Sequence, residues 1–397
     1  MKLLHDVRVL DLTNVLAGPF CCHQLAHMGA DVIKVEAPTG DLARQLGADP
    51  ELNARHMGVS FLAQNPGKRS ICINLKSASG KVLFRKLVRS ADVLVENFRP
   101  GVMDRLGLGF EVLKEENPNL VYCAISGFGQ NGPLRDLPAY DQIIQGMSGL
   151  MSITGAPDTA PYRVGFPVSD TVGGMTAAFA VASALARREE GEAIFIDVSM
   201  LEATLATMGW VVSNYLIAGK EPAPLGNENF TASPSGTFAT GDGLINIAAN
   251  KQEQFEAVCR VVGRPELIDD PRFAERQAHL ERRFELKGIL EDAMQCRSAE
   301  QWVEALSAAG VPAGPVFTVP QVLAHPQIAE RGMIGEFTEA PGVGRDIRLL
   351  RTGIKINGEA LRVERPPPQL GEHRAELLYE LDVAESEIDE PRKERLP

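Results

Sequence analysis

Residues 7–36 read VRVLDLTNVLAGPFCCHQLAHMGADVIKVE and carry the strongest fold signal in the chain. The β-branched and leucine run Val7–Leu12 predicts a strand, and Gly18-Pro19 begins a helix that ends at Gly29. Apolar alternation resumes in Asp31–Glu36, which predicts a second strand. Strand, helix and strand in this order form a βαβ unit, so the two strands should be parallel.

The same alternation of strands and helices continues to residue 217. Helices are predicted at 80–89, 110–116, 170–188 and 201–217, and strands at 93–95, 120–125 and 194–198. The fold class is therefore α/β, with a Rossmann-like parallel sheet in the large domain. The helix at 170–188 consists mostly of small apolar residues and is expected to be deeply buried.

The composition changes near residue 221, where a linker rich in Pro, Gly, Asn and Ser begins. Asp-Gly between alternating apolar runs predicts a hairpin at 236–249, and amphipathic helices are predicted at 252–262, 280–294 and 299–309. The expected domains are 1–220, the first part of the large domain, 221–330, a small α+β domain with linkers, and 331–397, a C-terminal segment. That segment should contain a strand-like run at 347–356, extended prolines at 366–368, a helix at 373–381 and a frayed end at 385–397.

Charge and composition exclude several classes of protein. The 40 Lys and Arg against 52 Asp and Glu give a net charge of -12, which disfavours nucleic acid and anionic membranes as partners. The six scattered cysteines form no CxxC pair and are expected to be reduced. The N-terminus lacks the apolar region of a signal peptide, and apolar stretches such as 175–186 are too short to span a bilayer. We therefore expect a cytoplasmic protein.

The motifs of several common enzyme classes are missing from the sequence. There is no P-loop, GxGxxG, HExxH or GxSxG, and no metal-ligand spacing, so NAD, zinc and serine hydrolase chemistry are not indicated and no metal is expected. Asp170 stands out because it lies where an extended apolar segment enters the helix predicted at 170–188. It fits a helix N-cap, and it also fits a functional carboxylate at the carboxyl edge of the sheet.

Basic residues in predicted loops and helix starts form a second candidate site. In an acidic protein such residues are where phosphates could be held, although solvated surface positions explain them equally well. They are Arg44, Lys68, Arg69, Arg99 and Arg105.

A set of short motifs is spread along nearly the whole chain in a fixed order. They include VLDLT at 9–13 with AGP at 17–19, GADVIKVE at 29–36, GKRS at 67–70, ENFRPG at 96–101, SGFGQ at 126–130 before GP at 132–133, AYD at 139–141 and the Asp170 segment. In this order and spacing the chain resembles the class III CoA-transferases, the formyl-CoA transferase and carnitine CoA-transferase (CaiB/BaiF) superfamily.

The resemblance implies that Asp170 is the nucleophile, which forms an acyl-aspartyl anhydride and then an aspartyl-CoA thioester. Coenzyme A thioesters are implied as substrates, with no permanently bound cofactor. The implied CoA-binding residues are the first-turn backbone at Leu16 and Ala17, Lys34 or its neighbours, Leu75, Asn97, Phe98, Arg105 and Tyr140. Phe98 could pack on the adenine, and Arg105 and Lys76 are the expected phosphate partners.

Two departures from the formyl-CoA transferases concern the acyl substrate. Leu16 stands where those enzymes carry a glutamine, and no run of four glycines occurs in the small domain. Oxalate is therefore not the expected acceptor. Within the family's range we expect succinyl-CoA or another dicarboxyl-CoA as donor, and a small dicarboxylic acid such as itaconate, mesaconate or malate as acceptor.

Two rival functions stay open at this point. An α-methylacyl-CoA racemase shares the fold and the aspartate but also uses a histidine, and Tyr140 stands at the matching position. A non-catalytic CoA-binding protein would need Asp170 only as a cap. The resemblance further implies a homodimer of interlocked rings, in which the segment 331–397 returns to the large domain.

Overall fold

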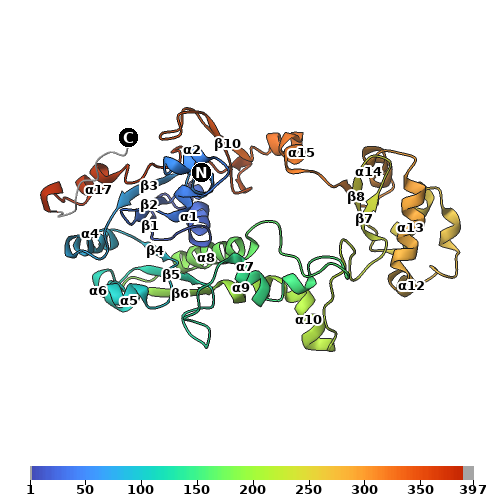
Figure 1. The fold of residues 1–397 in the computed structure, drawn as a ribbon, viewed down its shortest axis with the longest axis horizontal. Coiled ribbons are helices and arrows are strands. Elements are labelled where there is room, and N and C mark those ends of the chain that lie inside the picture. The colour runs from blue at the N-terminus through green and yellow to red at the C-terminus, as the bar shows by residue number, and fades with distance from the viewer. Residues whose placement is uncertain (1, 388–397) are drawn as a thin grey trace. The chain divides into compact units, whose positions relative to one another are not determined.

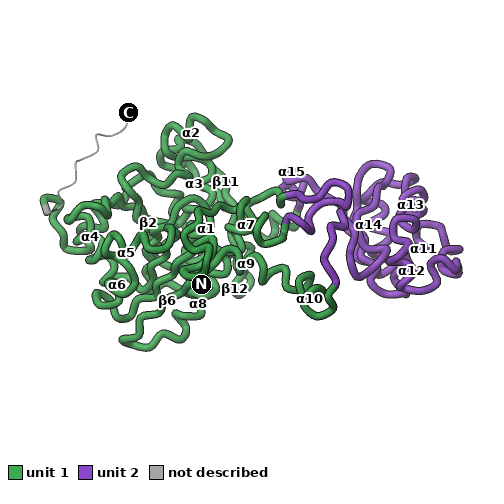
Figure 2. The backbone as a smooth tube through the Cα atoms, turned by 60° about the horizontal axis from the view of Figure 1, so that its bottom comes forward, with its two compact units in different colours: residues 1–150, 163–219, 326–397 green, residues 151–162, 220–325 purple. Residues whose placement is uncertain are grey.

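The computed structural model describes residues 2–387, so most of the end expected to fray, 388–397, lies outside the described residues. The chain forms two compact units (Figure 2). Unit 1 comprises residues 1–150, 163–219 and 326–397, and unit 2 comprises 151–162 and 220–325. The sequence predicted domain boundaries after residues 220 and 330, close to those observed after 219 and 325. It did not predict that the short segment 151–162 belongs to unit 2.

A six-stranded parallel sheet organises unit 1 (Figure 1). Its strands are β1 Arg8–Asp11, β2 Asp31–Glu36, β3 Lys68–Cys72, β4 Val93–Glu96, β5 Val121–Ser126 and β6 Ile194–Ser199. They lie in the order β3-β2-β1-β4-β5-β6, and every neighbouring pair is parallel. The predicted α/β class and parallel sheet are confirmed. The strand order reverses between β1 and β4, which is where ligands of such sheets bind.

Helices cover both faces of this sheet because each crossover returns the chain to the same edge. One face holds α1 Ala17–His27, α7 Asp141–Met147 and α8 Val168–Arg187, and the other holds α4 Ala78–Arg89, α6 Phe110–Glu116 and α17 Arg374–Glu380. Unit 1 also contains η1 Leu42–Gln45, α2 Pro50–Ala54, α3 Val59–Gln64, α5 Val102–Leu106, α9 Met200–Thr207, α10 Gly209–Ala218, α16 Pro326–Glu330 and η4 Glu385–Glu387, whereas η2 Met151–Ile153 belongs to unit 2.

The helix α8 is less buried than its composition predicted. Its inner face packs on α1 and β5 through residues such as Ala177 and Val181. Its outer face leaves Met175 46% and Phe179 74% exposed. By length and composition this 20-residue helix could cross a membrane, contrary to the expectation from the shorter stretch at 175–186, but it is a partly buried core helix of the sheet.

The helix predicted at 201–217 is two helices in the structure. α9 ends at Thr207 and α10 starts at Gly209, because glycine weakens a helix interior. α10 buries none of its side chains, and Trp210, Leu216 and Ile217 are 73%, 74% and 85% exposed. Exposed apolar side chains on one helix are typical of an interaction surface.

Unit 2 is a small α+β body, with the predicted hairpin formed by β7 Ser235–Ala239 and β8 Leu244–Ala248. β9 Ala313–Pro315 pairs antiparallel with β8. Trp302 is buried in its core and donates its indole N–H to the Met294 carbonyl at 2.8 Å. The helices are α11 Gln252–Val261, η3 Pro265–Ile268, α12 Arg276–Glu281, α13 Arg283–Met294, α14 Ala299–Ala308 and α15 Val319–Ala324.

The C-terminal part of unit 1 adds two small antiparallel pairs. They are β10 Ile334–Phe337 with β11 Ile347–Leu350, and β12 Lys355–Ile356 with β13 Glu359–Ala360. The run expected at 347–356 is therefore two strands from different pairs. α17 then packs beside β3, where Arg69 holds Glu376 at 2.9 Å.

Candidate active site

Asp170 lies in the first turn of α8, at the carboxyl edge of the sheet, but it is not the N-cap that its sequence position predicted. The N-cap is Pro167, which has no capping side chain. The acceptor is Asp141, from the first turn of α7. Its Oδ1 accepts the Ser169 amide at 2.8 Å and lies 3.4 Å from the Asp170 nitrogen. Asp141 satisfies the open N–H groups at the start of α8, and the Asp170 carboxyl forms no hydrogen bond or ion pair with residues 2–387.

The Asp170 carboxyl has an unusual electrostatic environment. Partial burial and, to a smaller extent, the nearby charge of Asp141 together raise its pKa to about 7. Both effects disfavour the carboxylate, because a second negative charge and a low dielectric each oppose ionisation. A carboxylate destabilised in this way is more basic and more nucleophilic than one exposed to water.

A glutamine on α7 ties the segment before α8 into place. Gln145 is fully buried and donates to Asp141 Oδ2 at 2.7 Å, while its Oε1 accepts the Val164 amide at 2.8 Å. The chain segment that leads into Asp170 is therefore anchored by hydrogen bonds at Val164 and at Ser169. The neighbouring Tyr140 is the N-cap of α7 and is 67% exposed.

The start of α1 touches α8 one turn from Asp170. A Cβ on Gly174 would lie 2.3 Å from the Ala17 carbonyl oxygen, so the two backbones meet with no room for a side chain. Gly174 is four residues beyond Asp170 and shares its helix face. Leu16 and Ala17, the first-turn residues expected to bind CoA, therefore lie beside the start of α8.

Lys34 does not occupy the position expected of a CoA contact. Its side chain is fully buried, with the ammonium 2.8 Å from the Thr13 carbonyl and 3.1 Å from Asp41. Burial opposes its charge, but the nearby carboxylates outweigh burial and raise its pKa. A direct contact to CoA is not available to this side chain as described, because it is fully buried and bonded to Thr13 and Asp41.

The basic residues proposed for phosphates divide into two groups. Three of them form internal ion pairs: Arg44 with Glu36 at 2.7 Å, Lys68 with Asp11 at 2.7 Å, and Arg69 with Asp31, Glu376 and Glu380. These three are not free to bind a phosphate. Lys76, Arg99 and Arg105 are exposed in the loops and helix after β3 and β4, and form no ion pair with any residue of the described chain.

Two apolar residues expected at the CoA site lie near these cations. Leu75 and Phe98 are half-buried and pack against the core cluster under α4 and α6. Glu96, the last residue of β4, accepts the Phe98 amide at 2.7 Å. Burial raises the pKa of Glu96 to about 7.

Asp141 and Glu96 are functional candidates that sequence reasoning did not single out. Asp141 was quoted only as part of the AYD motif. Glu96 ends β4 and Asp141 begins α7, so both carboxylates lie at the carboxyl edge of the sheet. Their positions at these element ends could have identified them as candidates. Residues 2–387 contain no group of three His, Cys, Asp or Glu side chains that could hold a metal ion.

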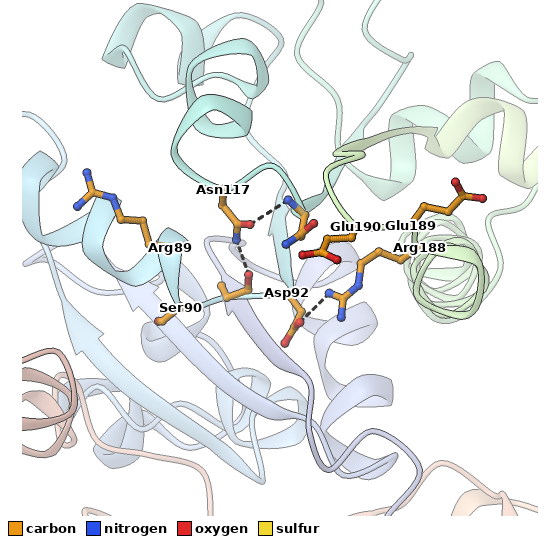
Figure 3. Close-up of a pocket in the computed structure, with 9 residues that line it drawn as sticks. Arg89, Ser90, Asp92, Asn117, Arg188, Glu189 and Glu190 are labelled. Atoms are coloured by element: carbon orange, nitrogen blue, oxygen red, sulfur yellow. Dashed lines mark hydrogen bonds and ion pairs between the residues drawn. The ribbon is translucent and has the colours of Figure 1, made fainter.

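A cavity of about 450 Å³ lies elsewhere in unit 1 (Figure 3). It is lined from the amino ends of the strands, where Asp92 precedes β4 and Arg188 follows α8. These two side chains form an ion pair at 2.6 Å within the cavity. It is at the opposite edge of the sheet from Asp170.

A doubly wound sheet with a partly buried carboxyl at its carboxyl edge is the arrangement in which α/β proteins bind ligands. Residues 4–374 match CoA-transferase family III. The chain belongs to this family, and it is a class III CoA-transferase with the CaiB/BaiF fold. Membership excludes the non-catalytic alternative.

Two curated relatives and one solved structure are similar over nearly the whole chain. A succinate–glutarate CoA-transferase of Agrobacterium fabrum is 39% identical, covering 96% of each chain. An acetyl-CoA:oxalate CoA-transferase of Acetobacter aceti is 41% identical, covering 95% of each. The crystal structure of a CAIB/BAIF family protein from Brucella suis has a TM-score of 0.82 at 36% identity, covering 95% of this chain and 98% of that one.

Proposed function

We propose that the protein moves CoA from an acyl-CoA donor to a free carboxylic acid, with Asp170 as the covalent nucleophile. One observation supports this most strongly. Asp170 is a partly buried carboxyl with a pKa raised to about 7, and its neighbour Asp141 performs the capping that would otherwise occupy it. A side chain relieved of structural bonds at the edge where ligands bind is available for chemistry.

The reaction proceeds through two kinds of covalent intermediate. An oxygen of the Asp170 carboxylate attacks the donor thioester carbonyl, the C–S bond breaks, and the CoA thiolate leaves behind an acyl-aspartyl anhydride. The thiolate attacks the aspartyl carbonyl and releases the donor acid as a carboxylate, which gives the aspartyl-CoA thioester. The acceptor carboxylate attacks that thioester, and the thiolate finally attacks the acceptor's carbonyl, which restores Asp170. Each attack exchanges one acyl bond for another, so no oxidant or net proton is required.

Burial supports this chemistry because anhydride intermediates hydrolyse when water reaches them. The α1 and α8 backbones meet at Gly174 beside the proposed nucleophile. Small residues on this helix face let a substrate approach the carboxylate closely.

The CoA moiety is proposed to bind along the carboxyl edge between β1 and the loops after β3 and β4. Leu16 and Ala17 would contact the pantetheine end, and Leu75 and Phe98 the adenine. Arg105 and Lys76 would bind phosphates, and they are free of internal ion pairs. Exposed Tyr140 would line the entrance next to Asp141.

For the substrates we propose succinyl-CoA or another dicarboxyl-CoA as donor and a small dicarboxylate as acceptor. Glutarate joins itaconate, mesaconate and malate as a candidate acceptor, since a relative is named for succinate and glutarate. A relative named for oxalate is similarly close, so Leu16 does not by itself exclude oxalate.

The assembly proposed is a homodimer, interlocked as in the family, in the cytoplasm. Exposed apolar side chains on α8 and α10 support the binding of a second subunit. Phe179, Trp210 and Leu216 are each more than two-thirds exposed. Among residues 2–387 no two cysteines form a disulfide, which fits a reducing compartment.

The test is exchange between succinyl-CoA and free glutarate, followed by mass spectrometry. We expect glutaryl-CoA to form, and quenched enzyme to carry a CoA adduct on the peptide that contains Asp170. Asp170→Ala should form neither product while still binding CoA. Exchange that survives in this variant would refute the nucleophile assignment. Deuterium incorporation at the α-carbon of a branched acyl-CoA, without exchange, would instead favour the racemase.

A further inference from the structure

The turn between β1 and α1 contains a strained residue. Val15 has φ +66°, in the left-handed region that β-branched residues avoid. Such a conformation persists only where neighbouring groups over-determine it. The turn leads directly into Leu16 and Ala17, at the start of α1.

The side chain of Asn97 bridges this turn to the loop after β4. Its Oδ1 accepts the Asn14 amide at 2.8 Å, and its Nδ2 donates to the Asn14 carbonyl at 2.8 Å. β1 and β4 are the neighbours between which the strand order reverses. The amide therefore spans the point of the sheet where a ligand crevice is expected.

Two buried charges hold the other side of the turn. Asp41 Oδ1 accepts the Val15 amide at 3.0 Å, and Lys34 donates to the Thr13 carbonyl at 2.8 Å. Lys34 and Asp41 are 3.1 Å apart, and both side chains are fully buried. Every residue from Thr13 to Val15 is thus fixed by a side chain from another part of the sheet.

The position of this turn controls the neighbourhood of Asp170. The Ala17 carbonyl lies against Gly174, one turn of α8 from Asp170, with no space between the backbones. If the turn relaxed, the start of α1 would shift against α8.

We propose that Asn97 is a positioning residue: its amide holds Val15 in the left-handed conformation, and so sets the place of the first turn relative to Asp170. This inference rests on the function proposed above. It differs from the CoA contact expected for Asn97, because one donor and one acceptor of its amide are already engaged by Asn14.

The test combines Asn97→Ala with Val15→Gly, since glycine adopts positive φ without strain. We expect N97A to lower kcat for succinyl-CoA and glutarate by about 10- to 100-fold, because a misplacement of about 1 Å is enough for such a loss. Its KM for succinyl-CoA should change by less than about threefold, because no substrate contact is removed. The double variant should recover most of kcat, since glycine at position 15 adopts the positive φ without being held by Asn97.

The inference is overturned if N97A raises KM alone, or if the double variant is no more active than N97A. Asn117→Ala is the matched control. The Asn117 amide also joins two segments, donating to Val88 and Ala91, but at the amino edge of the sheet. It should destabilise the fold without lowering kcat of the folded enzyme.

A failure of the proposed function can be distinguished from a failure of the positioning role of Asn97. Absence of exchange in the wild-type enzyme would count against the function. Thermal unfolding of the wild type, Asn97→Ala, Val15→Gly and the double variant would still test whether Asn97 holds the turn. We expect Asn97→Ala to lower the melting temperature less when residue 15 is glycine than when it is valine, and strictly additive shifts would overturn this role.

Discussion

The carboxylate of Asp141 caps the helix that carries Asp170, with its Oδ1 3.4 Å from the Asp170 amide nitrogen. One side chain therefore both holds the helix start and raises the pKa of the proposed nucleophile. Asp141→Asn keeps an oxygen acceptor for the cap but removes the charge. The acidic limb of the kcat/KM profile, which reports ionisation of Asp170, should move to lower pH, while burial keeps it above the ordinary value of 3.8. An unmoved limb would show that the charge of Asp141 does not act on Asp170.

Asp170→Asn should change how stability depends on pH. With a native pKa of about 7 against an ordinary value of 3.8, the folded wild-type protein binds more protons than the unfolded chain between these values. Its stability therefore falls as pH rises through that window, by up to about 4 kcal/mol. D170N escapes this loss, so urea unfolding should show it as stable as wild type near pH 4 and more stable at pH 8. Asp136→Asn is the control, because that side chain is 84% exposed.

Gly174→Ala should be strongly destabilising. Its Cβ would lie 2.3 Å from the Ala17 carbonyl oxygen, and backbone cannot give way as a flexible side chain can. We expect a loss of about 3 kcal/mol in urea unfolding, at the upper end for overpacking. Gly173→Ala is the matched control, since its Cβ would meet only the Met200 side chain, at 2.9 Å. Equal losses in both variants would contradict the close contact of α1 with α8.

Arg105→Ala should weaken CoA binding without slowing the chemical steps. Loss of a charge-assisted phosphate contact is worth about 2 kcal/mol, or about a 30-fold rise in KM for the acyl-CoA. Steady-state kinetics at low and high salt measure this, and the difference between variant and wild type should shrink at high salt. Arg89→Ala, at the amino edge and paired with Glu116 at 2.6 Å, should leave KM unchanged.

Leu216→Asp should disrupt the proposed dimer. The side chain is 74% exposed on α10, which buries nothing within its own chain. A charge there would be left unpaired in an apolar interface. Sedimentation velocity should show a monomer, whereas Val82→Asp, at a 59% exposed site on α4, should leave the dimer intact. A wild-type monomer would contradict the proposal directly.

The parallel sheet was predictable because its signal is local. Residues 31–36 contain three β-branched apolar residues between a glycine-containing break and a proline, and the structure places β2 at those same residues. The break at Gly209 and the exposed face of α8 were not predictable in this way, because small apolar residues fit a buried helix and an oligomer surface equally well.

The sequence pointed to Asp170 as a candidate but did not reveal its hydrogen bonding. A cap is a contact in space, and the capping residue Asp141 is 29 residues away. The buried ion pairs of Lys34, Arg44 and Lys68 could not be predicted from the sequence for the same reason. Their partners Asp11, Glu36 and Asp41 lie on other segments, so a basic residue in the sequence reveals its charge and not its neighbour.

The amide bridge of Asn97 has a consequence for identifying ligands by fold. A sheet of this strand order invites superposition of a dinucleotide on the reversal point between β1 and β4. Here that point is crossed by the Asn97 side chain, bonded on both sides to Asn14. A ligand placed at this point by backbone similarity alone would take no account of that side chain. In this protein the Asn97 side chain, and not strand order alone, therefore shapes the reversal point.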